Sequence, residues 1–393
     1  MIGGNASRPP STITLDNWQT APYLAWSFQH VADLFPTATI SRGAGPVAVL
    51  PEQPADLDDI LVPLYDTTTS VGSVMNDTET DGWIVAHRGT VLTERYPHAM
   101  PADTPHLLMS VSKSLVGLVT GVLVGAGTVS VDELVSRYVP ELADSGYAGA
   151  TVRQLLDMRS GIAFSEDYLD PNAEVRLLEQ ALGWAPRTDP RVPDTVFEFL
   201  RMLRRKSPHG GPFEYRSCES DVLGWVCEAA TGTRMPELMS EVLWSRLGAE
   251  FDANIGIDSV GTGLFDGGIS AALRDLARVG ALVLRDGVAL AGEQVVPAAW
   301  IADTLTGDAD SRAAFAAGPV EVGMPGGMYR NQFWLPYPDD NVLLCLGIHG
   351  QMIYVNRSAE LVAAKLSCWP LPQEPAKLYA TVRAFGAVAA ALT

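Results

Sequence analysis

Apolar runs along the chain alternate with short polar segments that contain Gly, Pro and Asp. β-Branched and aromatic residues flank the dipeptide Arg88-Gly89 within Trp83–Tyr96, which predicts two strands joined by a turn. Three further strands are predicted near the other end of the chain, at Gln332–Pro336, Val342–Ile348 and Leu361–Leu366. Strands at both ends of the chain imply a sheet that is assembled from distant segments.

The segment Ser110–Val124 is apolar on nearly every side, as expected of a helix buried in the middle of a protein. Gly125 and Gly127 then end this helix. Other helices are predicted after capping residues: Glu133–Arg137 after Ser130 with Glu133 as a capping box, Val152–Met158 after Thr151, residues 271–284 after Ser270, and a last helix near Lys377–Leu392.

The order of these elements predicts an α/β fold in which helices flank an antiparallel sheet. Residues 1–155 and 231–393 are expected to form the α/β part from both ends of the chain, and residues 156–230 a mainly helical insertion that includes Thr195–Arg205. The first 45 or so residues carry several prolines and are expected to be an irregular arm over the surface.

Composition and charge exclude some classes of function. The 393 residues are 47% hydrophobic, with 27 basic and 46 acidic residues and a formal net charge of -19. Such a chain can bury a full core, but it repels phosphate backbones and anionic lipid. We therefore expect no nucleic-acid partner and no membrane partner.

Sorting signals and cysteine pairs are not apparent in the sequence. The segment Met1–Trp18 lacks a cationic start followed by an apolar core, and the longest apolar run, Leu115–Val131, is interrupted by four glycines. The four cysteines are far apart, and we expect reduced thiols in a cytoplasmic protein: Cys218, Cys227, Cys345 and Cys368. The six scattered histidines do not suggest a metal site, and no cofactor is expected.

The tetrapeptide Ser110-Val111-Ser112-Lys113 opens the predicted buried helix. Residues three apart share a helix face, so the Ser110 hydroxyl and the Lys113 amine can form a hydrogen bond. A buried lysine favours its neutral form and can accept the serine proton, while the helix N-terminus favours a developing oxyanion. Ser-x-x-Lys arises by chance about once in a chain of this length, but Lys113 is the one lysine of four with a serine three residues before it.

A second piece of candidate chemistry is Tyr215-Arg216-Ser217, which follows a Gly-Gly-Pro turn. A tyrosine near a lysine can carry a proton to a departing amine or alcohol, and Ser217 adds a hydroxyl to the relay. The tripeptide is weak by itself, because a half-buried loop tyrosine is the ordinary explanation. Its position about a hundred residues after Ser-x-x-Lys makes it informative.

In this order of motifs the chain resembles the serine β-lactamase and penicillin-binding-protein superfamily. Within it, the chain is similar to the 6-aminohexanoate-dimer hydrolases and related carboxylesterases. Blocks that carry the resemblance run over nearly the whole chain: LDNWQ from Leu15, LLMSVSKSL around Ser110, YVPELA from Tyr138, EDYLDP from Glu166, FEYRS from Phe213, DGGIS from Asp266, GIHGQ from Gly347 and KLSCWP from Lys365.

The resemblance implies a β-lactamase-like fold and a role for each matching residue. Ser110 would be acylated, Lys113 and Tyr215 would move its proton, and the N–H groups of Ser110 and Ile348 would form the oxyanion hole, each worth about 3 kcal/mol. Substrate contacts would come from five residues: Tyr168, Ser217, Asp266, Trp334 and His349. The resemblance also makes a homodimer an expectation.

The chain departs from many β-lactam enzymes in two respects. It contains no Lys-Thr-Gly or Lys-Ser-Gly, and the matching segment is Cys345-Leu346-Gly347-Ile348, so a cation for a substrate carboxylate is missing. No acidic residue is assigned to deacylation, although Glu166 and Asp167 adjoin Tyr168 in the expected substrate loop. Strong β-lactamase activity is therefore not expected.

These observations predict a serine hydrolase that cleaves small esters or amides through an acyl-enzyme at Ser110. Two alternatives remain open: a β-lactamase or D-amino-acid peptidase of the same fold, and a binding protein that has lost turnover. An α/β-hydrolase is disfavoured, because the chain has no Gly-x-Ser-x-Gly, and it has no phosphate-binding loop.

Overall fold

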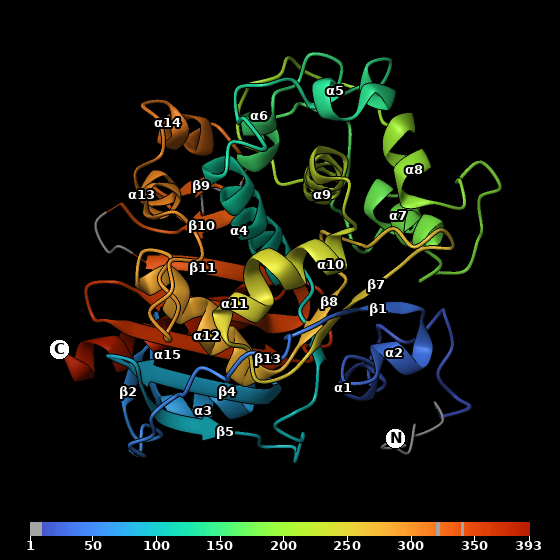
Figure 1. The fold of residues 1–393 in the computed structure, drawn as a ribbon. Helices are drawn as coiled ribbons and strands as arrows, with labels where there is room; N and C mark the ends of the chain where they lie inside the picture. The colour runs from blue at the N-terminus through green and yellow to red at the C-terminus, as the bar shows by residue number, and fades with distance from the viewer. Residues whose placement is uncertain (1–9, 320–322, 339–341) are drawn as a thin grey trace.

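A seven-stranded sheet lies at the centre of the computed structural model, which describes residues 10–319, 323–338 and 342–393 (Figure 1). The strand order is β5-β4-β13-β12-β11-β10-β9, and every neighbouring pair is antiparallel. Both ends of the chain supply strands, as the sequence predicts. Their bounds are β4 Thr80–His87, β5 Thr90–Arg95, β9 Met328–Arg330, β10 Phe333–Leu335, β11 Val342–Gly347, β12 Gln351–Asn356 and β13 Leu361–Ser367.

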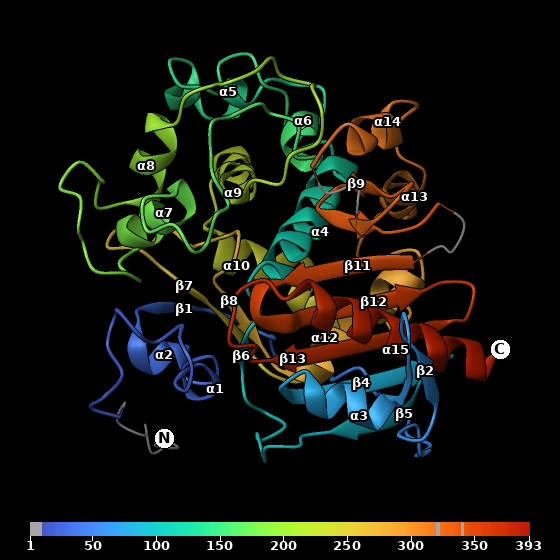
Figure 2. The same cartoon turned by 180° about the vertical axis from the view of Figure 1, so that it is seen from behind.

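Helices cover both faces of this sheet. Ile84 and Ala86 of β4 pack in the core that contains α12 (Leu273–Leu284), whereas Trp83 and Val85 pack in the core of the opposite face. That second core contains residues of α3 (Val71–Asp77) and α15 (Pro375–Leu392), which lie in front of the sheet in Figure 2. Burial on both faces explains why the central strands are almost continuously apolar in sequence.

A smaller four-stranded sheet leads the chain into the candidate site. Its order is β1-β7-β8-β6, and its bounds are β1 Thr37–Ile40, β7 Ala253–Gly256, β8 Ile269–Ala271 and β6 His106–Leu107. Strand β6 ends three residues before Ser110. The expected N-terminal arm contains α1 (Leu24–Ser27), α2 (Val31–Leu34) and β1, so its end is part of a sheet. Strands β2 (Leu61–Pro63) and β3 (Thr68–Ser70) form a separate pair.

Helix α4 (Val111–Gly125) runs between the edge of the central sheet and a group of helices at the top of Figure 1. This group contains α5 Val135–Tyr138, α6 Val152–Leu156, α7 Glu174–Leu182, α8 Val196–Met202 and α9 Ser217–Thr231. The remaining helices in the described ranges are η1 Pro140–Leu142, α10 Met235–Met239, η2 Ser240–Trp244, α11 Ser245–Leu247, α13 Ala298–Thr306, α14 Ser311–Ala316 and η4 Ile348–Gly350. The division of the chain at residues 156 and 230 stays a prediction.

The predicted hairpin is confirmed, since Arg88 and Gly89 join β4 to β5 with φ angles of 51° and 78°. The cap of α6 is confirmed as well, because the Thr151 hydroxyl accepts a hydrogen bond from the Gln154 N–H and the Gln154 side chain accepts one from the Thr151 N–H. Both features depend on residues that are close in sequence.

Two predicted caps are wrong. Ser270 lies within β8, where it is paired with Leu107 and Asn254, and α12 begins three residues later at Leu273. The Ser130 N–H donates to the Tyr138 hydroxyl, and α5 begins only at Val135. In both places the serine that the local sequence pattern predicts as a helix cap instead forms contacts with residues more distant in the chain.

Candidate active site

Ser110 and Lys113 are brought together at the start of α4. Ser110 is the residue before the helix, and Lys113 lies in its first turn. The Lys113 Nζ is 2.8 Å from the Ser110 Oγ and 2.8 Å from the carbonyl oxygen of Asp266. Lys113 is 1% exposed, while Ser110 is only half-buried. The three-residue spacing thus produces the predicted contact, with the hydroxyl on the accessible side.

The backbone is strained on both sides of the predicted oxyanion hole. Met109, directly before Ser110, has a φ of 47°, and His349, directly after Ile348, has a φ of 60°. Non-glycine residues rarely adopt such angles, and they are frequent at functional sites. Gly347 allows a close approach, because a Cβ there would lie 2.5 Å from the carbonyl oxygen of Leu108. The end of β11 is therefore pressed against the segment that delivers Ser110.

Tyr215 lies beside both Ser110 and Lys113. The Lys113 Nζ is 5.2 Å from the centre of the Tyr215 ring, and that ring stacks on Trp334 with a centroid distance of 5.2 Å. Burial raises the pKa of Tyr215, and hydrogen bonds with Ser110 and Lys113 oppose this rise. The phenol is therefore protonated at neutral pH and can serve as a proton donor.

The charge of Lys113 differs from the sequence expectation. Burial lowers the pKa of Lys113, but the negative charges that Tyr215, Asp266, Glu166 and Asp221 carry when they are ionised raise it more, so the net pKa is above the ordinary value. One oxygen of the Asp266 carboxylate is 3.7 Å from the amine. The expectation of a neutral lysine is wrong for the resting site, because burial was weighed without the acidic groups that the fold gathers there.

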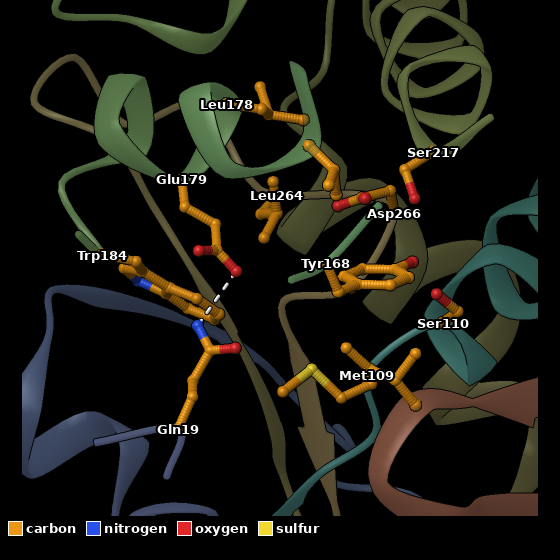
Figure 3. Close-up of a pocket in the computed structure, with 13 residues that line it drawn as sticks. Gln19, Met109, Ser110, Tyr168, Leu178, Glu179, Trp184, Ser217, Leu264 and Asp266 are labelled. Atoms are coloured by element: carbon orange, nitrogen blue, oxygen red, sulfur yellow. Dashed lines mark hydrogen bonds between the residues drawn. The ribbon is translucent and has the colours of Figure 1, made fainter. Parts of the chain in front are cut away.

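Two cavities meet at Ser110. The first, here called the inner cavity, has a volume of about 40 Å³ and extends toward Gln19, Glu179 and Trp184 (Figure 3). The second, the outer cavity, has a volume of about 920 Å³ and extends over Trp334, Met324 and Trp369. Ser110 and Ile348 line both cavities. Ser110 is the residue before α4, and Ile348 is the first residue of η4. The backbone N–H groups at such positions have no hydrogen-bond partner within the helix.

Four of the five predicted substrate residues line these cavities. Tyr168 lines both, Ser217 and Asp266 line the inner one, and Trp334 lines the outer one. His349 lines neither: its ring nitrogen Nδ1 is 2.7 Å from the Trp369 carbonyl oxygen, and burial lowers its pKa to about 4. The His349 side chain therefore supports the turn after Ile348, and it lines a third cavity that does not include Ser110.

Three polar residues that were given no role hold the site together. The Glu166 carboxylate accepts hydrogen bonds from the Ser217 N–H and, at 2.5 Å, from the Tyr168 hydroxyl. Asp221 is fully buried and accepts from the N–H groups of Phe265 and Asp266, which places the Asp266 carbonyl at Lys113. The Gln351 amide bonds to both backbone groups of Ser367 and to the Ile348 carbonyl.

Some features are not found in the part of the chain that the structure describes. No group of three or more His, Cys, Asp or Glu residues there could hold a metal ion. All four cysteines are free thiols. None of the described helices combines the length and the apolar character that crossing a bilayer requires.

Comparison with known proteins connects this geometry to a family. The model of the family described as Beta-lactamase matches residues 71–387. The chain belongs to the beta-lactamase family. Its sequence is 40% identical over 359 residues to a 6-aminohexanoate-dimer hydrolase from Paenarthrobacter ureafaciens, a match that covers 91% of this chain and 89% of the relative.

Solved structures agree with this assignment. A Bacillus anthracis protein, described as a candidate 6-aminohexanoate-dimer hydrolase, has a TM-score of 0.89 and 25% identity, with 97% of each chain covered. A family VIII carboxylesterase has a TM-score of 0.59 and 17% identity, with 81% of this chain and 95% of that chain covered, and is similar in fold. The predicted beta-lactamase-like fold and hydrolase class are thereby confirmed.

Proposed function

We propose that this beta-lactamase family member hydrolyses small esters and amides through an acyl-enzyme on Ser110. The observation that carries the proposal is the 2.8 Å contact between the Ser110 hydroxyl and the Lys113 amine where two cavities meet. A serine hydroxyl becomes a good nucleophile only when a neighbouring base removes its proton. The substrate carbonyl would lie over Ser110, with its acyl part in the inner cavity and its leaving group in the outer one.

Acylation begins after the Lys113–Tyr215 pair has lost one proton to solvent. Ser110 Oγ then forms a bond to the carbonyl carbon while its proton passes to the pair. The N–H groups of Ser110 and Ile348 stabilise the negative oxygen of the tetrahedral intermediate. The bond to the leaving nitrogen or oxygen breaks as Tyr215 donates a proton to it, and Lys113 resupplies Tyr215.

Deacylation repeats these steps with water. A water molecule attacks the acyl carbon, its proton passes to the pair, and the Ser110–acyl bond breaks as Ser110 recovers a proton. The products are a carboxylic acid and the free enzyme. Neither step requires a metal ion or an organic cofactor in this scheme.

The charges of the cavities favour some substrates over others. The described lining of the outer cavity carries one lysine and four glutamates, and that lysine, Lys206, is paired to Glu214 at 2.5 Å. An anionic substrate such as a penicillin meets net negative charge there. In the inner cavity the buried Asp266 Oδ1 has no hydrogen-bond partner among the described residues, and it offers an acceptor to an amine-bearing acyl group.

One assay tests this proposal against its alternatives. The substrates are p-nitrophenyl acetate, the linear dimer of 6-aminohexanoate and nitrocefin, with Ser110→Ala as the control. We expect turnover of the ester and the amide, little turnover of nitrocefin, and none in the variant. Turnover of nitrocefin alone would favour a β-lactamase. A folded protein that turned over none of them would favour a binding protein.

A further inference from the structure

A third cavity lies behind the inner one and plays no part in the mechanism above. This side cavity has a volume of about 170 Å³. Four residues line both it and the inner cavity: Gln19, Tyr168, Glu179 and Trp184. The two spaces are therefore neighbours that share one wall.

The middle of that wall is a pair of polar side chains. Gln19 Nε2 donates to Glu179 Oε1 at 2.9 Å, and Arg176 Nη1 is 2.9 Å from the other Glu179 oxygen. Figure 3 shows the Gln19–Glu179 hydrogen bond on the far side of the inner cavity from Ser110 and Ser217. Gln19 Oε1 also accepts a long hydrogen bond of 3.4 Å from Arg176. A neutral glutamine that is only half-buried can give up these two bonds and change rotamer while the Glu179–Arg176 ion pair stays in place.

The rest of the wall is fixed by packing. Trp184 is 2% exposed, stacks on Phe35 with a centroid distance of 5.1 Å, and meets Trp18 edge to face at 5.2 Å. A Cβ on Gly256 would lie 2.2 Å from the Trp184 ring, so the sequence keeps room for this indole. An opening between the two cavities would therefore form at Gln19 and leave Trp184 as its rigid side.

The side cavity has an apolar rim at the surface. Leu15, Leu169 and Leu371 all line it, and they are 44%, 73% and 51% exposed. Large aliphatic side chains gathered around an opening are typical of a surface that receives an apolar ligand. The rim and the proposed acyl site lie on opposite sides of the shared wall.

The inner cavity alone limits the acyl group. Its 40 Å³ accommodates about three water-sized groups, which corresponds to a short acyl chain. We propose that the inner and side cavities form one acyl passage, gated by Gln19 and Glu179, through which linear aliphatic acyl chains of about six or more carbons reach the leucine rim. This inference rests on the proposed function, because it requires acylation of Ser110.

The test measures kcat/KM of the full chain for p-nitrophenyl acetate and p-nitrophenyl octanoate. Ala185→Trp would obstruct the side cavity, since Ala185 lines it and does not line the inner cavity. We expect the octanoate-to-acetate ratio to fall about ten-fold or more, because several methylenes lose their buried site. The matched control is Ala302→Trp on the exposed face of α13, which should keep the wild-type ratio.

A second variant tests the gate. Gln19→Ala removes the closing hydrogen bond and should raise the octanoate-to-acetate ratio several-fold. A crystal structure after reaction with an octyl fluorophosphonate should show the alkyl chain passing Gln19 into the side cavity. An octyl chain in the outer cavity, or the same ratio in all variants, would overturn the passage.

The outcomes separate this inference from the function on which it rests. The passage alone is refuted if p-nitrophenyl acetate is hydrolysed, if Ser110→Ala abolishes that hydrolysis, and if Ala185→Trp leaves the octanoate-to-acetate ratio of kcat/KM unchanged. If the folded protein hydrolyses neither ester, the proposed function fails and the passage fails with it.

Discussion

The molecule contains two buried lysines that each contact a serine hydroxyl, and the two pairs differ in electrostatic environment and in access to a cavity. Lys113 contacts Ser110 at the start of α4, and Lys365 contacts Ser367 on β13. Both lysines are at most 1% exposed. A search for a buried serine–lysine pair would therefore find both.

Their electrostatic environments are opposite in effect. Burial lowers the pKa of Lys365 to about 7, because the attraction of Asp81, Cys368 and Glu79 is too weak to offset it. At Lys113 the acidic groups outweigh burial, and the pKa is raised. By the criterion of a neutral amine alone, Lys365 would be the better base.

Access separates the two pairs. Ser110 lines the inner and outer cavities, whereas Ser367 is 0% exposed and lines none of the described cavities. Ile348, whose N–H is proposed to stabilise a developing oxyanion, lines the same two cavities as Ser110. In the proposed mechanism, access for a substrate carbonyl therefore decides which pair can react, and the protonation of the lysine sets the pH at which that pair is used.

Replacing each lysine in turn is the strongest challenge to this comparison. Lys113→Met should lower kcat/KM for p-nitrophenyl acetate by about 10³-fold with the fold intact, because the serine loses its base. Lys365→Met should retain the activity within about ten-fold. Steady-state kinetics and circular dichroism on both variants measure this, and equal losses would remove the distinction.

The role of Tyr215 gives the next largest effect. Tyr215→Phe should lower amide hydrolysis about 10²-fold and hydrolysis of an activated ester much less, since poor leaving groups need a proton most. The comparison uses the linear dimer of 6-aminohexanoate and p-nitrophenyl acetate. Equal losses on both substrates would argue against proton donation by Tyr215.

The lowered pKa of Lys365 predicts a dependence of stability on pH. Between about pH 7 and 10 the unfolded chain binds a proton at this lysine that the folded protein does not, so the free energy of unfolding rises with pH, by about 1 kcal/mol per unit. This increase in the free energy of unfolding is lost again as the pH falls toward 7. Urea denaturation at pH 7.5 and 9 should show a larger increase for the wild type than for Lys365→Met, and parallel increases would contradict it.

The raised pKa of Lys113 predicts the smallest effect. The active form of the Lys113–Tyr215 pair has lost a proton, so kcat/KM should increase as the pH rises. This increase forms the rising limb of the pH–rate profile. Asp266→Asn removes a group that raises the pKa of Lys113, and the limb should move to lower pH by about one unit. The exposed Asp132→Asn is the control. An unchanged limb would show that Asp266 does not act on this lysine, and a shift to higher pH would contradict the direction of its effect.

The sequence predicts best what depends on neighbours along the chain. The Ser110–Lys113 contact, the hairpin at Arg88-Gly89 and the Thr151 cap all join residues a few positions apart. The inner cavity was not predictable in this way, because its wall combines Gln19, Glu179 and Trp184 from separate parts of the chain. Strand β12, which carries Gln351, was missed although Gly350 precedes it and Asn356-Arg357-Ser358 ends it.

The protonation of Lys113 shows the same limit. Burial can be inferred from an apolar helix, but the groups that raise the pKa of Lys113 come from residues 215, 266, 166 and 221. Ser270 shows the same limit for secondary structure. It pairs in β8 with Leu107 and Asn254, which precede it by 163 and 16 residues. Long-range contacts decide both cases, and no local pattern contains them.

Covalent labelling of the serine tests the central claim most directly. The wild type, Lys365→Met, Lys113→Met and Ser110→Ala would each be treated with a fluorophosphonate, and the labelled peptide identified by mass spectrometry. We predict rapid modification of Ser110 in the first two, slow modification in the third and none in the fourth. Modification of another serine, or equal rates with and without Lys113, would contradict the assignment of Ser110 and its lysine.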